Sequence, residues 1–166
     1  MMNLHIRPFS PDDMEEVVQL SLLAWAPVFH SFEQVLGTRI YSHLFPDWKK
    51  TQRAVVEKIC REHEKTLVWV AEAHGKITGF IAYTLDSQEN DQENTGEVEL
   101  LAVHPEFQNH GIGTEVNRFV LEKMKENGIK LAIVGTGGDP GHAPARRTYE
   151  KAGYTALPIV RYYQDL

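Results

Sequence analysis

A turn with closely spaced glycines constrains this chain more than any other feature of its sequence. The turn, Gln108-Asn109-His110-Gly111-Ile112-Gly113, follows a predicted strand at 97–103 and precedes residues with helical periodicity. Glycine allows backbone conformations that bring successive N–H groups together, and the dipole of the following helix adds positive potential. A strand, a glycine turn and a helix in this order are typical of a site for a diphosphate group.

The turn differs from the common nucleotide-binding motifs. A dinucleotide fingerprint would need glycine where Val116 stands, and the Gly-Lys-Ser/Thr of a P-loop does not occur. The sequence therefore disfavours NAD and ATP sites. A glycine pair alone also occurs in connections that need a left-handed residue and bind nothing, so the interpretation depends on its context.

The N-terminal half predicts one strand and several helices. Residues 3–9 favour a strand, and Ser10-Pro11-Asp12-Asp13 supplies the start of a helix that we expect to run to about Trp25. Residues 28–64 carry helical patterns interrupted at Gly37 and Pro46. We expect two or three short helices there.

The middle of the chain predicts a β-hairpin followed by a polar loop. Residues 66–73 and 76–85 are rich in β-branched and aromatic side chains, and His74-Gly75 between them suits a two-residue turn. Residues 86–96 are polar and acidic, which indicates a solvated loop before the strand at 97–103.

The C-terminal part predicts alternating helices and strands. The helix after the glycine turn should stop at Asn127-Gly128, and an apolar run at 129–134 favours a buried strand. After a loop at 135–141 we expect a helix with Pro144 near its start and Gly153 just past its end, and then a terminal strand pair or bent strand at 154–163. Without a repeat or linker, residues 1–166 are interpreted as one α/β domain.

Composition and charge narrow the classes of partner. The net charge of -6 argues against nucleic acid, whose binding depends on clustered Lys and Arg, and favours cationic small molecules. No apolar run approaches the ~20 residues that span a bilayer, so we expect no membrane span. The first eight residues do not resemble a signal peptide, which predicts a cytoplasmic protein.

The residues that could bind a metal or form a disulfide are sparse. Cys60 is the only cysteine, which excludes an internal disulfide and a Cys-x-x-Cys site. His104, His110 and His142 have no spacing typical of a metal site. We expect no bound metal.

Three segments together resemble the GNAT family, the Gcn5-related N-acetyltransferases. Gln108-x-x-Gly111-x-Gly113 matches the Gln/Arg-x-x-Gly-x-Gly/Ala motif of that family, and Glu-Val-Glu-Leu-Leu-Ala-Val-His-Pro at 97–105 is similar to its fourth strand. Ala-Arg-Arg-Thr-Tyr-Glu-Lys-Ala-Gly-Tyr at 145–154 is similar to its second signature, Asn-x-x-Ala-x-x-x-Tyr-Glu-Lys-x-Gly-Phe. His142 stands where the family often has Asn, and the loop before it is unusually rich in glycine.

The resemblance implies a fold and a cosubstrate. The fold would be a mixed, mostly antiparallel twisted sheet flanked by helices, with splayed central strands. The cosubstrate would be acetyl-coenzyme A (acetyl-CoA), and no metal would take part. The residues implied to bind acetyl-CoA are Leu101, Ala102, Val103, Gln108, Asn109, His110, Gly111, Ile112, Gly113, Thr114, His142, Ala145 and Tyr149.

Transfer of an acetyl group to an amine requires a base. An alkylammonium with a pKa near 10 is about 99.9% protonated at pH 7, so exposing its lone pair costs roughly 4 kcal/mol. Glu97 and Glu99 are two apart on one predicted strand, so both should face one side while Val98 and Leu100 face the other. Repulsion should raise the pKa of one carboxyl, and either could be the base. Both could also be solvated surface carboxylates.

Other groups complete the expected chemistry. The resemblance implies Tyr149 as general acid toward the coenzyme sulfur, although a tyrosine on a helix can also serve packing alone. A backbone N–H near 101–103 could stabilise the oxyanion of the intermediate. Trp25, Phe29, Phe32 and Trp48 either wall an acceptor pocket or form core.

Three functions fit this pattern. The first is an N-acetyltransferase for a primary amine on a small molecule, by direct attack in a ternary complex. The second is a non-catalytic acyl-CoA-binding module with a regulatory role. The third is a peptide or protein N-acetyltransferase. The tail with Tyr162-Tyr163 leaves open a homodimer.

Overall fold

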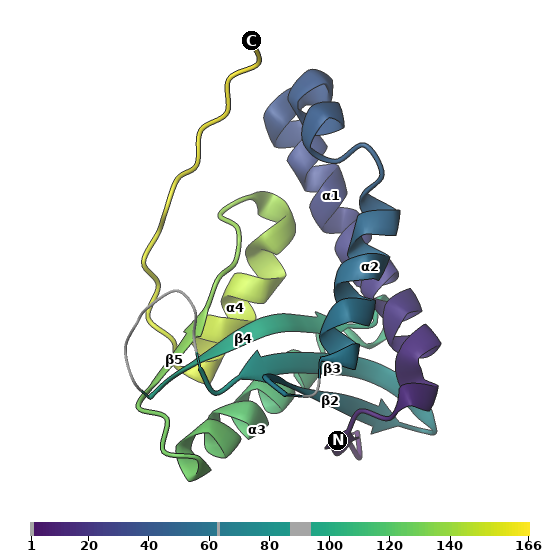
Figure 1. Ribbon diagram of the computed structural model, residues 1–166, viewed down its shortest axis with the longest axis vertical. Helices are drawn as coiled ribbons and strands as arrows, with labels where there is room; N and C mark the ends of the chain where they lie inside the picture. The colour runs from purple at the N-terminus through teal and green to yellow at the C-terminus, as the bar shows by residue number, and fades with distance from the viewer. Residues whose placement is uncertain (1, 63, 87–93) are drawn as a thin grey trace.

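Five strands form one sheet in chain order within the described residues, 2–62, 64–86 and 94–166 of a computed structural model (Figure 1). The strands are β1 (His5–Pro8), β2 (Thr66–Ala73), β3 (Lys76–Thr84), β4 (Thr95–Val103) and β5 (Leu131–Val134). Neighbours are antiparallel except β4 and β5, which are parallel. The predicted mixed, mostly antiparallel sheet is confirmed.

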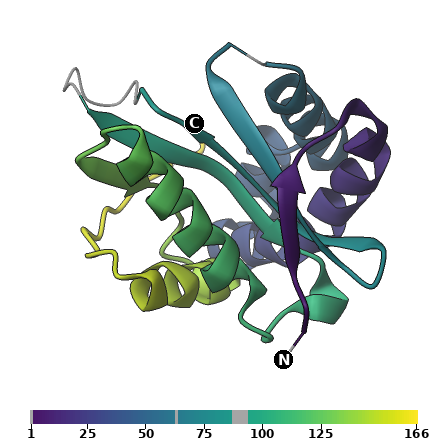
Figure 2. The ribbon, with the colours of Figure 1, turned by 90° about the horizontal axis from the view of Figure 1, so that it is seen from below.

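Helices cover both faces of this sheet (Figures 1 and 2). One face carries α1 (Met14–Leu44) and α2 (Trp48–Arg61), and the other carries α3 (Ile112–Glu126) with α4 (Ala143–Ala152) packed beside it. Short 3-10 turns lie at Pro11–Asp13, Pro105–Phe107 and Pro140–His142. The helices flank the sheet as the sequence predicts.

Two apolar clusters form the core, one on each face of the sheet. The cluster beneath α1 and α2 contains Val17, Val18, Leu20, Val56, Cys60, Val70, Ile77, Phe80 and Ala102. The cluster beneath α3 contains Ala71, Ile81, Tyr83, Val98, Ile112, Val116, Val120 and Met124. Val70 and Ala71 of β2, and Phe80 and Ile81 of β3, lie in opposite clusters because successive side chains of a strand point to opposite faces.

The first helix is longer than predicted. We expected it to end near Trp25, but α1 continues to Leu44 with Pro27 inside it, so that prediction is wrong. A proline inside a helix removes one hydrogen bond, yet Val28 and Ser31 beyond it are buried and extend the packed face. The predicted interruptions are confirmed, because Gly37 has a non-helical φ of 77° and α2 begins after Pro46.

The hairpin and the two helices after the glycine turn are confirmed. The strand predicted at 129–134 is present as β5 at 131–134, but its residues are exposed or half-buried and not buried as expected. His74 and Gly75 both have positive φ, 53° and 73°, as a two-residue hairpin turn requires. The helix α3 stops before Gly128, and α4 before Gly153. The expected acidic loop lies mostly at 87–93, outside the described residues, and β4 begins at Thr95, two residues earlier than predicted.

The predicted terminal strand at 154–163 is wrong. The chain beyond Gly153 is extended but belongs to no strand in the described structure, and it runs away from the sheet toward the end of α1 (Figure 1). β-branched and aromatic residues favour an extended backbone. A strand also needs a neighbour about 4.8 Å away, which composition cannot supply.

A bulge and a divergence make β4 irregular. Val98 pairs with Tyr83 and Leu100 pairs with Ala82, so Glu99 is an extra residue in the ladder. On its other side β4 pairs with β5 only from Thr95 to Val98. The strands separate beyond that point, and the expected splayed strands are confirmed.

Candidate active site

A cavity of about 590 Å³ lies where β4 and β5 diverge. Its walls come from β4, the glycine turn, the first turn of α3, the loop after β5, α4 and the middle of α1. Twelve of the thirteen residues implied to bind acetyl-CoA line it, and His110 does not. The His110 ring instead lies 3.3 Å from the Phe107 carbonyl oxygen.

One edge of β4 faces this cavity with its main chain. The His104 N–H donates to the Thr78 carbonyl at 2.8 Å, and bonded pairs alternate along an antiparallel ladder. Leu101 and Val103 therefore point their N–H and C=O groups away from β3, toward the cavity. The Gln108 amide donates to the Val103 carbonyl at 3.0 Å, which ties the glycine turn to this edge.

The glycine turn presents the amino end of α3 to the cavity. Gly111 adopts φ 81° at the N-cap, and among the described residues no side chain caps this helix. The N–H groups of Ile112, Gly113 and Thr114 lie in the first turn, where a helix has no internal acceptors. Together with the helix dipole they can hold an anion.

Glycine at 113 allows close packing behind these amides. A Cβ there would lie 3.3 Å from Thr148 Cγ2 and 3.5 Å from Val103 Cγ2. The short side chain thus lets α3 start against both β4 and α4. The second glycine of the motif is therefore needed for this close packing as well as for the exposed amides.

Glu97 and Glu99 lie on the face of the sheet that α1 and α2 cover. The Glu99 carboxylate accepts a hydrogen bond from the Thr66 hydroxyl at 3.3 Å, and Glu97 precedes Val98, which packs under α3. The expectation that Leu100 shares the face of Val98 is wrong. The bulge at Glu99 shifts the alternation, and Leu100 packs against the α1 side.

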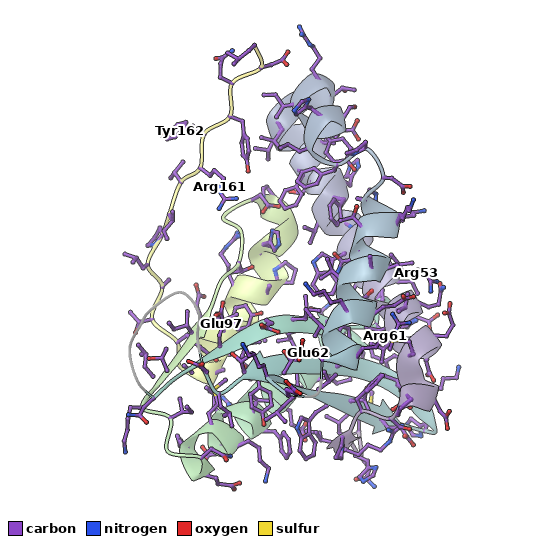
Figure 3. All side chains as sticks on the ribbon, viewed as in Figure 1. Arg53, Arg61, Glu62, Glu97, Arg161 and Tyr162 are labelled. Carbon is purple, nitrogen blue, oxygen red and sulfur yellow. The ribbon has the colours of Figure 1, made fainter. Side chains whose placement is uncertain are left out.

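The two carboxylates differ in their relation to the cavity. Glu99 lines it, whereas Glu97 is not among its walls. Partial burial raises the pKa of Glu99, the Thr66 hydrogen bond opposes the rise, and repulsion from Glu97 and Glu62 adds to it. Glu62 follows α2, above the same face of the sheet as Glu97 (Figure 3).

Tyr149 lies buried in the cavity wall on α4, one turn after Ala145. Burial raises the pKa of its phenol, so the hydroxyl is protonated at neutral pH. Its ring meets Tyr154 edge to face, with centroids 5.7 Å apart. A protonated hydroxyl in this position can donate a hydrogen bond or a proton to a group in the cavity.

The glycine-rich loop is fixed by a group of polar side chains, of which only His142 was singled out in the sequence. Asp139 accepts from the Ser31 hydroxyl at 2.6 Å, and its other oxygen lies 2.5 Å from His142 Nδ1. Burial opposes the charge of Asp139, but the hydrogen bonds from Ser31 and His142 outweigh it and lower its pKa. Arg146 donates to the carbonyls of Gly137 and Asp139.

This loop also contacts α1 closely. A Cβ on Gly141 would lie 2.6 Å from Ser31 Cβ, which allows only glycine at this contact. His142 therefore lines the cavity in a fixed position, oriented through Asp139. Only the unusual density of glycines and the acid three residues before His142 could have indicated this arrangement.

Three of the four residues of the predicted aromatic wall belong to a separate, half-buried aromatic cluster. Trp25 lines the cavity, but Phe29, Phe32 and Trp48 do not. They pack on one another and on Phe45, with Phe29 and Trp48 stacked at 4.4 Å between centroids. These three residues pack on other aromatic side chains outside both core clusters, so they are neither cavity wall nor central core.

The described residues also bear on metal binding and on membrane insertion. No group of three or more His, Cys, Asp or Glu side chains converges there as a metal site would require. None of the helices described is both long and apolar enough to cross a membrane.

The comparisons identify the family. The model of the acetyltransferase (GNAT) family matches residues 22–154, so the chain belongs to this family of acetyl-CoA-dependent acetyltransferases. Mycothiol acetyltransferase from Sanguibacter keddieii is 32% identical over 91 residues, 54% of this chain and 28% of that protein. The chain spans 28% to 40% of the length of the curated relatives it matches.

Solved structures share the fold. The PaiA N-acetyltransferase from Thermoplasma acidophilum, solved in complex with coenzyme A, has a TM-score of 0.69 at 20% identity, covering 94% of this chain and 92% of that one. An aminoglycoside 6'-N-acetyltransferase from Acinetobacter haemolyticus has a TM-score of 0.68 at 13% identity, covering 98% of both chains.

Proposed function

We propose that this protein transfers the acetyl group of acetyl-CoA to a primary amine of a small molecule. The observation that carries the proposal is the cavity between β4 and β5. The amides of 112–114 lie at one end of this cavity, and the Glu99 side chain of β4 also lines it. The main-chain amides suit a diphosphate, and the Glu99 carboxylate suits an ammonium group. The exposed edge of β4 joins them and suits an extended chain that contains amides.

The reaction proceeds by direct attack in a ternary complex. The Glu99 carboxylate accepts the proton of the acceptor amine, and the amine nitrogen then bonds to the acetyl carbon. Main-chain N–H groups at the open edge of β4, such as that of Leu101, stabilise the oxyanion of the tetrahedral intermediate. The nitrogen loses its second proton to solvent as it becomes an amide. When the carbon–sulfur bond breaks, Tyr149 gives its proton to the coenzyme thiolate and regains one from solvent.

Glu97 has a supporting role in this scheme. Its charge raises the pKa of Glu99 toward the value that suits a base working near neutral pH. Because Glu97 is not part of the cavity wall, we assign the base to Glu99. This assignment selects between two carboxylates that the sequence ranked as nearly equal.

A small cationic acceptor fits the charge of the site. Glu62 and Glu97 both lie near enough to Glu99 for their repulsion to raise its pKa. The chain as a whole carries a net charge of -6. Solved structures of the same fold are named aminoglycoside N-acetyltransferases, which supports amino sugars as first candidates. Polyamines are further candidates because they are small and cationic.

A thiol-release assay over a panel of amines tests the proposal. The panel holds polyamines, amino acids, aminoglycosides and short peptides, and calorimetry measures acetyl-CoA binding in parallel. We expect binding together with release that depends on one of the small amines. Binding without release from any acceptor would support a regulatory module instead, and release with peptides alone would support a peptide acceptor.

A further inference from the structure

Asp139, in the loop before α4, has a carboxylate surrounded by hydrogen-bond donors. One oxygen accepts from the Ser31 hydroxyl at 2.6 Å and from the Gly141 N–H at 3.1 Å, and the other lies 2.5 Å from His142 Nδ1. The side chain is only 10% exposed. Burial opposes its charge, but the hydrogen bonds outweigh this effect and hold the pKa of Asp139 below its ordinary value. The carboxylate is therefore ionised at neutral pH.

The contact with Asp139 decides which nitrogen of His142 carries a proton. An ionised carboxylate can only accept a hydrogen bond, so Nδ1 is the donor, and a neutral imidazole then has its lone pair at Nε2. Within the described residues no group hydrogen-bonds to Nε2, and this atom is not among the fully buried polar atoms without a partner. Because His142 lines the cavity, a proton acceptor of fixed orientation lies in the cavity wall.

Two glycines let the loop close around this pair of side chains. A Cβ on Gly137 would lie 2.5 Å from His142 Nδ1, and a Cβ on Gly141 would lie 3.0 Å from Asp139 Oδ2. Arg146 also fixes the loop, because it donates to the carbonyls of Gly137 and Asp139 at 2.6 and 2.8 Å. Two of the four glycines at 135–141 therefore have the His142–Asp139 pair as their steric cause.

Acetyl transfer to an amine leaves one proton without an acceptor in the protein. An alkylammonium must lose two protons to become an amide, and Glu99 takes the first of them before the attack. The second leaves after the nitrogen–carbon bond has formed, when the nitrogen is positively charged and Glu99 already holds a proton. A base other than Glu99 therefore has to stand in the cavity if the protein is to assist this second transfer.

We propose that His142 is a second base of the reaction and that Asp139 is its positioning residue, an inference that rests on the proposed function. In the tetrahedral intermediate an N–H bond breaks, its electron pair stays on the nitrogen, and the proton bonds to His142 Nε2. The pair of the carbon–sulfur bond leaves on the sulfur, which takes the proton of Tyr149. The imidazolium then passes its proton to solvent and returns to the neutral form.

The identity of the residue at 142 is essential to this step. The GNAT motif often has Asn at this position, and an amide cannot take a proton, whereas an imidazole can. The buried Asp139 carboxylate stabilises the imidazolium that forms. The two bases also come from different walls of the cavity, Glu99 from β4 and His142 from the residue before α4. Each base therefore meets the nitrogen independently.

Steady-state kinetics of His142→Asn give the first test. Asparagine keeps an N–H for Asp139 but cannot accept a proton, so kcat should fall about 100-fold, at the lower end of the range of 10² to 10⁴ known for general bases. The dissociation constant of acetyl-CoA, from calorimetry, should stay within about twofold. His30→Asn, at an exposed histidine of α1, is the matched control and should keep the original rate. An unchanged kcat in His142→Asn, or a loss confined to acetyl-CoA affinity, would overturn the proposal.

An acceptor whose amine is neutral near pH 7, such as a hydrazine or a fluorinated amine, separates the two bases. It has no first proton to lose, so Glu99→Gln should cost this acceptor much less than it costs an alkylammonium. Its nitrogen still becomes positively charged on attack, so His142→Asn should lower kcat as much as before. If both losses shrank together, His142 would serve the first proton, and the proposal would be overturned.

Thiol release by the unaltered chain distinguishes the failure of this proposal from the failure of the proposed function. If the unaltered chain releases no thiol with any amine, the acetyltransferase activity and the second base are both excluded. If it releases thiol with an amine and His142→Asn does so equally fast, only the second base is excluded.

NMR of the imidazole nitrogens tests the geometry without turnover. At alkaline pH, correlation spectra of nitrogen and carbon-bound hydrogen distinguish a proton on Nδ1 from a proton on Nε2, and the signal absent from His142→Asn assigns the residue. We expect the proton on Nδ1 in the unaltered chain. Asp139→Asn should lose this preference, with kcat lower by roughly 10-fold or more because the lone pair is turned to the wrong nitrogen. A proton on Nε2 in the unaltered chain would leave no acceptor for the amine and would overturn the proposal.

Discussion

The two ends of the cavity are built from different kinds of groups. At the glycine turn the available groups are main-chain amides of 112–114 and of the open edge of β4. Elsewhere along the wall they are side chains, chiefly Glu99 and Trp25 at the end away from the turn, and Tyr149 of α4 also lines the cavity. The first end is set by backbone conformation and the second by the identity of single residues.

This difference predicts how substitutions should act. A side-chain change at the Glu99 end should lower turnover and leave acetyl-CoA binding intact. A change in the backbone of the turn should weaken acetyl-CoA binding and leave the chemistry intact. Measuring kcat and the dissociation constant of acetyl-CoA for the same variants therefore tests the division directly.

The largest expected effect is that of Glu99→Gln. Glutamine keeps the size and the acceptor for Thr66 but cannot take a proton, so kcat should fall about 1,000-fold, within the range of 10² to 10⁴ known for general bases. Calorimetry should show acetyl-CoA affinity within about twofold of the unaltered protein. Steady-state rates with the best amine of the panel measure the loss.

Glu62→Gln is the matched control for that prediction. It removes a carboxylate that repels Glu99 without touching the cavity wall. Its kcat should stay within a few-fold of the original. If Glu62→Gln were as damaging as Glu99→Gln, the site would need only negative charge, and Glu99 would lose its role as base.

Tyr149→Phe should have the next largest effect. The change removes the proton donor but keeps the ring that packs on Tyr154. A thiolate leaves readily because its conjugate thiol has a pKa near 8.5, so acid catalysis contributes less and kcat should fall about 100-fold. Single-turnover rates check it, and Tyr154→Phe is the control. If Tyr149→Phe and Tyr154→Phe had equal rates, the role of Tyr149 would be packing and not proton donation.

The sequence predicted the first end of the cavity better than the second. The turn at 108–113 is one continuous segment. Its backbone conformation requires glycine, so the requirement is visible in the sequence itself. The open edge of β4 depends on a bulge at Glu99 and on the short length of β5. The splayed strands themselves were expected from the family resemblance, and the residues that separate them were not.

The second end depends on contacts between distant parts of the chain. Ser31 and Asp139 are 108 positions apart and fix the loop that carries His142. Trp25, Phe29 and Phe32 look alike in periodicity, yet only the first reaches the cavity. Likewise residues 154–163 have the composition of a strand. Composition does not determine whether another strand lies beside them.

The glycine turn offers a prediction of intermediate size. Gly111 and Gly128 have nearly the same φ, 81° and 79°, and a Cβ on either would meet nothing within 4 Å. Alanine at such a position is strained by about 1 to 2 kcal/mol. Both alanine variants should therefore lose similar stability, measured by thermal unfolding.

Acetyl-CoA binding should separate the two variants. Gly111 lines the cavity and caps α3, whereas Gly128 follows the far end of the same helix. Relief of the strain at 111 would move the amides, so Gly111→Ala should weaken acetyl-CoA binding about 10-fold, with kcat at saturation little changed. Gly128→Ala should bind normally. Equal affinities for both would argue against a diphosphate at this turn.

The smallest effect expected is a shift in the pH profile of Glu97→Gln. The base must be ionised, so kcat should rise with pH through the pKa of Glu99, which lies above its ordinary value. Removing the charge of Glu97 lessens the repulsion that disfavours the Glu99 carboxylate. The pKa of Glu99 then falls, and the acidic limb moves to lower pH by less than about one unit.

Two controls test whether the shift comes from the charge of Glu97. The difference between Glu97→Gln and the original should shrink as ionic strength rises, because screening weakens repulsion between partly exposed charges. Glu115→Gln, in the first turn of α3, should leave the limb in place. A limb that moved to higher pH in Glu97→Gln would mean that Glu97 is itself the base or assists it through a proton. The division of roles between the two carboxylates would then have to be reversed.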